Sequence, residues 1–295
     1  MKHKAGFVNI IGLPNVGKST LMNALVGERL SIITPKAQTT RHRILGIINE
    51  ENYQIVLSDT PGFIDNPAYK MQESMNEFVR SAIEDADVFL FMTELGANIE
   101  KQKDLYIPLL NSKVPVIVLI NKIDKSKSQE EVSEYGEAWQ KTLPEAEVYY
   151  ISAIESFNVE GVKNRIIELL PESPPYYDKD ALTDKTERFF VAEIIREKIL
   201  QLYKQEIPYS VEVDVESFKE EDGLTRISAI IYTERDTQKS IIIGKGGEAI
   251  KKVGTLARKD IEKFIQQKVF LELFVKVKEK WRDSDFYLKN FGYKG

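Results

Sequence analysis

The chain has 295 residues, of which 42% are hydrophobic and 29% are charged, a length and composition that suit two ordinary globular domains. It contains no cysteine and only two histidines, which excludes disulfides, cysteine-zinc sites and thiol chemistry. Catalysis must therefore rest on phosphate-type electrostatics or on carboxylates. No apolar run approaches the roughly eighteen residues of a membrane span, and the N-terminus lacks a signal-peptide pattern, so we expect a cytoplasmic protein.

Charge is distributed unevenly along the chain. The net charge is −5, yet the segment from Arg235 to Gly295 carries 15 Lys and Arg against 8 Asp and Glu. A basic end on an acidic protein suggests a polyanionic partner there. The alternative is an ordinary solvated basic face.

Apolar runs alternate with segments of helical period from Gly6 to Leu170. The runs are 6–11, 53–59, 87–93, 114–120 and 147–152, and the helical segments include 71–86 and 159–170. This alternation predicts an α/β domain with a mostly parallel sheet covered on both faces. Residues 42–59 contain two strand-like runs around a short polar turn, which predicts a hairpin and one antiparallel edge strand.

A glycine loop, "GLPNVGKS" at residues 12–19, lies between the first strand and the first helix. Two glycines five residues apart, followed by Lys and Ser, form the pattern that cradles phosphates with backbone N–H groups at a helix N-terminus. Lys18 would reach the β- and γ-phosphates, and the Ser19 hydroxyl would bind Mg²⁺. A plain glycine turn is the weaker alternative.

Three further signatures follow at strand ends and in order. "SDTPG" at 58–62 places Asp59 to hold Mg²⁺ and the Gly62 N–H to face a γ-phosphate. In "NKID" at 121–124, Asp124 can accept from both the ring N–H and the amino group of guanine, while Asn121 reaches the far edge of the ring. "ISAI" at 151–154 brings the Ala153 backbone near the guanine oxygen.

Beyond Leu170, "PESPPYYDKDALTD" breaks any regular element and indicates a linker. We therefore predict a first domain over 1–172, a linker over 173–186 and a second domain over 187–295. The second domain shows the order α-β-β-α-α-β, which is a small α+β fold. Its "GKGG" sequence, residues 244–247, lies between a short apolar helix and a longer amphipathic one.

These motifs carry a resemblance to a known family. The first domain resembles the translation-factor-related Ras-like GTPases, and "PKAQTTRHRILGI" with "DTPGF" resembles the bacterial Era group within the TrmE-Era-EngA-like superfamily. The segment "KAQTTRHR", residues 36–43, would be the mobile loop that senses the γ-phosphate. Either Thr39 or Thr40 should supply a second Mg²⁺ hydroxyl, and we favour Thr40. For His42 and Arg43 we expect solvated side chains.

The resemblance assigns roles to a set of residues. Those implied to catalyse are Lys18, Thr40 and Gly62, and those implied to bind the metal are Ser19, Thr40 and Asp59. Those implied to bind GTP or GDP are Asn15, Val16, Gly17, Lys18, Ser19, Thr20, Thr39, Thr40, Asp59, Gly62, Asn121, Lys122, Asp124, Ser152, Ala153 and Ile154. Where Ras proteins place a water-orienting glutamine this chain has Phe63, which implies slow intrinsic hydrolysis unless the side chain merely packs over the loop.

The second domain resembles a type II KH domain, whose glycine loop clamps single-stranded RNA. The residues implied to bind RNA are Lys239, Ile242, Gly244, Lys245, Gly246, Gly247, Lys251, Lys252 and Arg258. The aromatic residues of the tail, Trp281, Phe286, Tyr287, Phe291 and Tyr293, could stack on bases, but we expect most of them to anchor that segment to its own domain.

The resemblance covers nearly the whole chain and implies a monomeric GTP-hydrolysing switch. Its implied partner is small-subunit (16S) ribosomal RNA near the 3′ end, during subunit assembly. The alternative is an RNA-binding scaffold in which the nucleotide is structural. A further role at the inner face of the cell membrane is left open.

Overall fold

A computed structural model describes residues 3–294 of the chain. They form two compact units. The first comprises residues up to 31, 40–66 and 75–184, and the second comprises 32–39, 67–74 and the residues from 185 onward. In the described part of the chain, the helices are all too short or too polar to span a bilayer.

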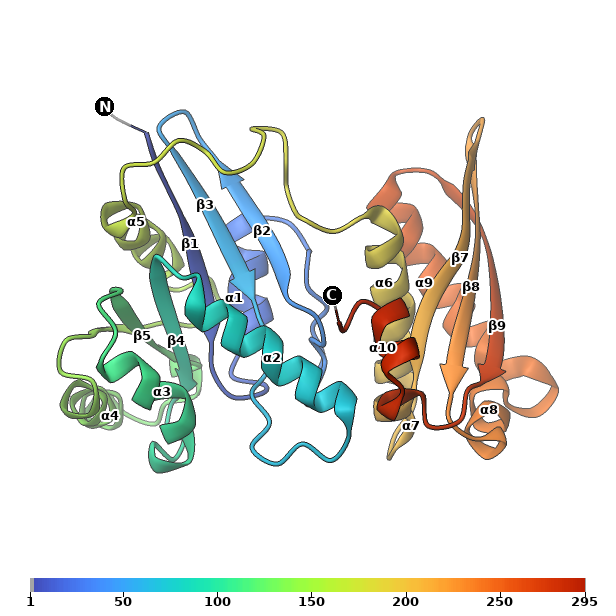
Figure 1. Ribbon diagram of the computed structural model, residues 1–295, viewed down its shortest axis with the longest axis horizontal. Coiled ribbons are helices and arrows are strands. Elements are labelled where there is room, and N and C mark those ends of the chain that lie inside the picture. Colours follow the sequence, from blue (N-terminus) through green and yellow to red (C-terminus); the bar gives the residue numbers. More distant parts are fainter. Residues whose placement is uncertain (1–2, 295) are drawn as a thin grey trace. The chain divides into compact units, whose positions relative to one another are not determined.

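The first unit is built on a six-stranded sheet with the order β2-β3-β1-β4-β5-β6 (Figure 1). Its strands are β1 (Lys4–Ile11), β2 (Ile44–Asn49), β3 (Tyr53–Asp59), β4 (Val88–Glu94), β5 (Val116–Asn121) and β6 (Glu147–Tyr150). All neighbouring pairs are parallel except β2 with β3. The predicted parallel sheet with one antiparallel edge strand is therefore confirmed.

Helices accompany this sheet. They are α1 (Lys18–Val26), α2 (Lys70–Glu84), α3 (Lys103–Leu110), α4 (Gln129–Thr142) and α5 (Val159–Leu169), with short 3₁₀ turns at Glu100–Gln102 and Ile123–Lys125. The central strands are fully buried: Val118, Leu119 and Ile120 of β5 each have no exposed surface. Such continuous apolar strands need cover on both faces. Because β1, β3 and β5 run parallel, the loops that follow them meet at one edge of the sheet.

The proline-rich segment after α5 is bound to the first unit along β2 and β3. The buried Gln54 side chain accepts from the backbone N–H of Tyr176 at 2.7 Å and donates to the carbonyl of Tyr177 at 2.8 Å. Further along, the Ile47 N–H donates to the Leu182 carbonyl at 2.8 Å. Residues 173–184, predicted as a linker, thus form a strap that belongs with the first unit. The sequence could not show this, because the prolines exclude helix and strand but not docking on an edge.

The strap ends close to the start of the next helix. The Asp184 side chain accepts from the Leu45 N–H at 2.9 Å, and the Thr183 hydroxyl donates to the Leu45 carbonyl at 2.7 Å. Thr186 then caps the N-terminus of α6, where its side chain accepts from the Phe189 N–H. Only Lys185 separates these two anchor points.

The second unit has a three-stranded sheet of order β7-β8-β9, with β8 and β9 parallel. Its strands are β7 (Glu212–Glu221), β8 (Leu224–Thr233) and β9 (Lys268–Val277). Its helices are α6 (Glu187–Leu202), α7 (Ile207–Ser210), α8 (Asp236–Ile243), α9 (Glu248–Ile265) and α10 (Asp285–Asn290), with 3₁₀ turns at Lys245–Gly247 and Trp281–Asp283. This is the predicted α+β order with two short helices, α7 and α10, added. In the tail, Trp281 and Tyr293 are buried, which confirms their role as anchors.

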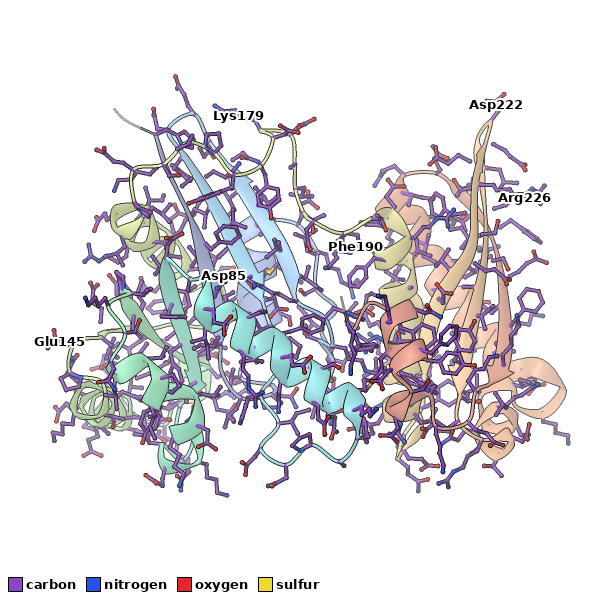
Figure 2. All side chains as sticks on the ribbon, in the orientation of Figure 1. Asp85, Glu145, Lys179, Phe190, Asp222 and Arg226 are labelled. Carbon is purple, nitrogen blue, oxygen red and sulfur yellow. The ribbon has the colours of Figure 1, made fainter. Side chains whose placement is uncertain are left out.

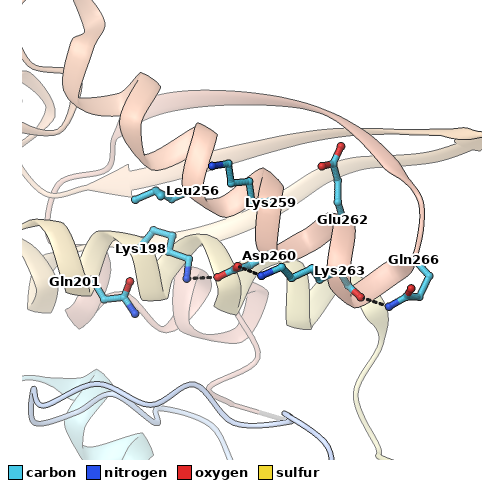
Figure 3. Close-up of a pocket in the computed structure, with 8 residues that line it drawn as sticks. All are labelled: Lys198, Gln201, Leu256, Lys259, Asp260, Glu262, Lys263 and Gln266. Atoms are coloured by element: carbon cyan, nitrogen blue, oxygen red, sulfur yellow. Dashed lines mark hydrogen bonds and ion pairs between the residues drawn. The ribbon is translucent and has the colours of Figure 1, made fainter.

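An open pocket of about 490 Å³ lies in the second unit and is lined by residues of α6 and α9 (Figure 3). On one wall Lys198 forms an ion pair with Asp260, and its side chain is only 7% exposed. This partly buried ion pair connects α6 to α9. The residues that line the pocket include none of those predicted to bind RNA, so it is distinct from the surface around the glycine loop.

Candidate functional site

The glycine loop of the first unit ends at a backbone position that only glycine suits. Gly17 immediately precedes α1 and has φ 111°, in the left-handed region. A Cβ atom at this position would lie 2.3 Å from the Asn121 amide nitrogen. The absence of a side chain thus brings "NKID" up against the phosphate loop.

Three side-chain oxygens predicted to bind magnesium meet at the start of α1. The Ser19 hydroxyl donates to Asp59 Oδ2 at 2.7 Å and lies 2.8 Å from Thr40 Oγ1. Asp59 is fully buried, and among residues 3–294 its second oxygen, Oδ1, has no hydrogen-bond partner. An unpartnered buried carboxylate oxygen beside two hydroxyls is a set of hard donors that suits Mg²⁺. The residues present therefore fit this ion.

Thr39 does not reach this cluster. Its hydroxyl donates to the Lys36 carbonyl at 2.6 Å and lies 2.7 Å from the Thr34 hydroxyl. Thr39 therefore faces its own loop, and Thr40 is the threonine that the structure brings to Ser19 and Asp59. Sequence analysis favoured Thr40 from the family resemblance, but the local pattern alone does not separate the two, because the side chains of neighbouring loop residues follow no fixed period.

Lys18 is folded onto the phosphate loop itself. Its ammonium donates to the carbonyls of Gly12 at 3.0 Å and Leu13 at 2.9 Å, and the residue is only 6% exposed. Burial lowers the pKa of Lys18 from 10.5 to about 8, although the charge of Asp59 partly raises it. Burial likewise raises the pKa of Asp59. The direct partners of the Lys18 ammonium are two neutral carbonyls, and a bound polyphosphate would replace them with negatively charged oxygens.

This lowered pKa predicts how the stability of the ligand-free protein depends on pH. Because the folded-state pKa of about 8 lies below 10.5, the unfolded chain holds the Lys18 proton more tightly between these values, and stability rises with pH across that window. We expect wild type to gain about 2 to 3 kcal/mol relative to Lys18→Met from pH 7.5 to pH 10.5. Chemical denaturation of both proteins over this range measures the difference in their free energies of unfolding. For the control Lys113→Met, which replaces an exposed lysine, the difference from wild type should not change with pH. A flat difference for Lys18→Met as well would contradict the assignment.

The predicted base-recognition loops are joined through Asn121. Its amide donates to the Val16 carbonyl at 2.8 Å and accepts from the Ala153 N–H at 2.9 Å. Asn121 therefore ties the phosphate loop to the "ISAI" loop, and the Ala153 N–H points at Asn121 in this structure. Asp124 is exposed and accepts from the Ser152 hydroxyl at 2.6 Å, which orients the carboxylate while leaving its other oxygen for a base.

Lys122 and Gly62 also contact the phosphate loop. The Lys122 ammonium donates to the Asn15 carbonyl at 2.7 Å and pairs with Glu94, a partner that no sequence signal indicated. A Cβ at Gly62 would lie 2.6 Å from the backbone of Pro14. The last residue of "DTPG" must therefore be glycine for this segment to pass so close to the phosphate loop. Of the other predicted residues, Thr20 lies in α1 and is partly buried, whereas Ile154 is 74% exposed.

Two expectations about neighbouring side chains are settled by the packing. Phe63 is partly buried against a core cluster that includes Ile11 and Phe91, so it packs rather than faces solvent. The expectation that His42 and Arg43 are solvated is wrong. His42 is 8% exposed, and the Arg43 side chain is ion-paired with Asp85 and 15% exposed.

The glycine loop of the second unit adopts a backbone that requires glycine at several positions. Gly244, Gly246 and Gly247 have φ of 73°, 61° and 80°. No atom would lie within 4 Å of a Cβ at Gly246 or Gly247. Lys245, Lys251, Lys252 and Arg258 are exposed and Lys239 is partly buried. The loop is thus an open, positively charged turn ahead of α9.

The prediction that Ile242 contacts RNA is wrong. Ile242 is fully buried in the core of the second unit, beside residues such as Val253. Its neighbour Ile241 is 49% exposed and takes the outward position instead. Residues 241–243 are all isoleucine, so no polar residue among them indicates which side of the helix faces the core.

Comparisons with known proteins identify both units. The family model described as "50S ribosome-binding GTPase" matches residues 7–122, and that of the KH domain matches residues 206–282. Over 294 residues, 99% of each chain, the sequence is 44% identical to GTPase Era of Clostridium kluyveri. The chain belongs to the Era family of GTPases.

Solved Era structures agree with this assignment. A variant of Aquifex aeolicus Era bound to GDP and AlF₄⁻ superposes with a TM-score of 0.93 at 39% identity, covering 99% of this chain and all of that one. Era in complex with MgGDPNP and nucleotides 1506–1542 of 16S ribosomal RNA also gives a TM-score of 0.93, at 40% identity and the same coverage. The protein is thus a GTPase with a C-terminal KH domain, as the sequence predicted.

Proposed function

We propose that this chain is a GTP-driven switch that binds single-stranded 16S ribosomal RNA near its 3′ end and assists assembly of the small ribosomal subunit. The observation that carries the proposal is full-length similarity to an Era protein solved with both MgGDPNP and nucleotides 1506–1542 of 16S ribosomal RNA. Both corresponding sites have a local counterpart in this chain, one at Ser19 and the other at Lys245.

At the nucleotide site, this chain's residues would bind and orient the triphosphate. Backbone N–H groups of residues 15–20 would hold the phosphates at the N-terminus of α1. Lys18 would leave the carbonyls of Gly12 and Leu13 and turn to the β- and γ-phosphates, and the Gly62 N–H would face the γ-phosphate. Ser19, Thr40 and Asp59 would hold Mg²⁺, which neutralises the charge that develops on the phosphate oxygens.

Asp124 would select the base. The other residues around the guanine ring would be Asn121, Lys122, Ser152, Ala153 and Ile154. The Ser152 hydroxyl on Asp124 Oδ1 supports this role, because it holds the carboxylate in one orientation. A carboxylate acceptor pairs with the two N–H donors of guanine, which adenine does not offer.

Hydrolysis is expected to be slow in the free protein. Phe63 carries no group that could orient a water molecule, and it is occupied by packing. The attacking water must then be held by backbone groups, by the metal ion or by a partner. Loss of the γ-phosphate would release the loop that bears Thr40.

At the KH domain, exposed cations around the glycine loop would attract the RNA backbone, and the absence of side chains on the glycines would let it approach closely. The proposal takes the protein to be a cytoplasmic monomer. Association with the inner face of the cell membrane stays a prediction that rests on the basic C-terminal segment.

The test combines hydrolysis and RNA binding. The full-length protein is assayed for multiple-turnover GTP hydrolysis alone, with an RNA of the sequence of nucleotides 1506–1542, and with a scrambled RNA of equal length. We expect the matching RNA to bind and to raise the rate. Lys245→Glu should weaken RNA binding and reduce its salt dependence, while Lys113→Glu, an exposed lysine of the GTPase unit, should change neither.

A hydrolysis rate that ignores both RNAs, with tight binding of the matching one, would favour the scaffold with a structural nucleotide. Equal binding of the matching and scrambled RNAs would instead contradict the RNA assignment.

A further inference from the structure

Arg43 lies at the end of the loop that carries Thr40 and directly precedes β2. Its guanidinium forms a two-pronged ion pair with Asp85, with Nη1 to Oδ2 at 2.7 Å and Nη2 to Oδ1 at 2.9 Å. Its Nε donates to the Ser58 hydroxyl at 2.8 Å. Such a fork fixes the side chain in direction as well as in distance.

The partners of Arg43 are themselves anchored in the interior. Ser58 and Asn9 are fully buried. The Asn9 amide donates to Asp85 Oδ1 at 2.7 Å and also to the Ala82 carbonyl, and Arg43 Nη2 donates to Asn9 Oδ1 at 3.4 Å. The pair is therefore partly exposed on one side, where Asp85 is 44% exposed, and attached to buried polar groups on the other.

Each residue of this network lies on, or directly beside, a helix, strand or loop that adjoins a loop of the nucleotide site. Asn9 is on β1, which leads into the phosphate loop, and Ser58 directly precedes Asp59 on β3. Asp85 follows the last residue of α2, the helix after the "DTPG" loop (Figure 2). Arg43 follows Thr40 by three residues.

We propose that Arg43 is a positioning residue for GTP hydrolysis, acting through Asp85, Ser58 and Asn9; this rests on the proposed function. The network fixes the C-terminal end of the mobile loop, so that few residues are free between the anchor and Thr40. Thr40 then returns to Ser19 and Asp59 with little loss of conformational freedom. Without the anchor, a longer segment must be ordered each time Thr40 engages.

The proposal predicts an effect on the GTP state alone. In the proposed switch Thr40 would respond to the γ-phosphate and metal, whereas GDP would leave the loop free, so loosening the anchor should weaken GTP binding and slow hydrolysis without weakening GDP binding. A merely structural tie between β2 and α2 would lower the melting temperature and weaken both nucleotides equally.

The variants are Arg43→Lys and Asp85→Asn, with the charge swap Arg43→Asp/Asp85→Arg as a rescue. Arg165→Lys is the matched control, because Arg165 forms a comparable fork with Glu147 in the same unit. Measured are the single-turnover hydrolysis rate, the affinities for MgGTP (as a non-hydrolysable analogue) and MgGDP, and the melting temperature.

We expect both single variants to lower the rate and the ratio of GTP to GDP affinity by about 10-fold, with GDP affinity unchanged. The swap should recover part of this loss, and Arg165→Lys should change neither quantity. Equal weakening of both nucleotides, or no change in either variant, would overturn the inference while leaving the proposed function intact. Failure of the wild type itself to hydrolyse GTP would instead sink the proposed function, and this inference with it.

Discussion

We expect Ser19→Ala to lower the rate of Mg²⁺-dependent GTP hydrolysis by about 10²- to 10³-fold, the loss that follows when one group that stabilises transition-state charge is removed. The Ser19 hydroxyl lies at the meeting point of Asp59 Oδ2 and Thr40 Oγ1, at 2.7 and 2.8 Å. Its loss removes one proposed metal ligand and the contact that brings Thr40 to the site. Single-turnover hydrolysis across a Mg²⁺ titration measures the effect.

The affinity for GDP in the absence of Mg²⁺ distinguishes loss of the metal site from misfolding. Ser19→Ala should bind GDP without Mg²⁺ as wild type does, because the phosphate loop itself is intact. Ser81→Ala, on α2 with its hydroxyl donating to the Phe78 carbonyl, is the control and should hydrolyse GTP normally. A Ser19→Ala protein with wild-type rate and Mg²⁺ dependence would refute the proposed metal site.

Asp124→Asn should shift base preference from guanine toward xanthine by at least about 10²-fold, because a site that hydrogen-bonds its ligand rejects the analogue whose donors no longer match. The amide offers a donor where guanine also presents a donor, whereas xanthine presents a carbonyl oxygen. Calorimetric titration with GDP and XDP gives both affinities for each protein.

Asp222→Asn is a matched control, since Asp222 is an exposed carboxylate at the tip of the β7–β8 hairpin (Figure 2). It should retain wild-type preference. If Asp124→Asn kept full selectivity for guanine, base recognition would have to be assigned elsewhere, and the role of "NKID" would be lost.

The sequence predicted the sheet and its order of elements because each strand has its own apolar run and each functional loop follows directly at its end. Continuous apolar runs of this length fit parallel strands that are covered on both faces, and few other arrangements would bury them. Loop side chains were harder, as Thr39 and Thr40 show. Which of two neighbours points inward depends on contacts such as that of Thr39 with Thr34, which come from tertiary packing rather than local pattern.

Polar contacts between residues far apart in the chain could not be predicted from the sequence. Arg43 and Asp85 are 42 residues apart, and no sequence pattern pairs them. Gln54 binds the strap from a distance of 122 residues along the chain. A buried glutamine in an apolar strand is the only local sign that something polar must dock there, because its amide cannot be left unpaired.

The strap also determines how much of the edge strand β2 is available for pairing with another strand. Strand β2 reads "ILGIIN" and occupies the rim of the six-stranded sheet, where its free N–H and C=O groups would template another chain. Residues 181–184 saturate part of that rim at Leu45 and Ile47. Proteolytic nicking or incomplete docking of the proline-rich segment would therefore leave the backbone of an apolar edge strand open to pairing with a strand of another molecule.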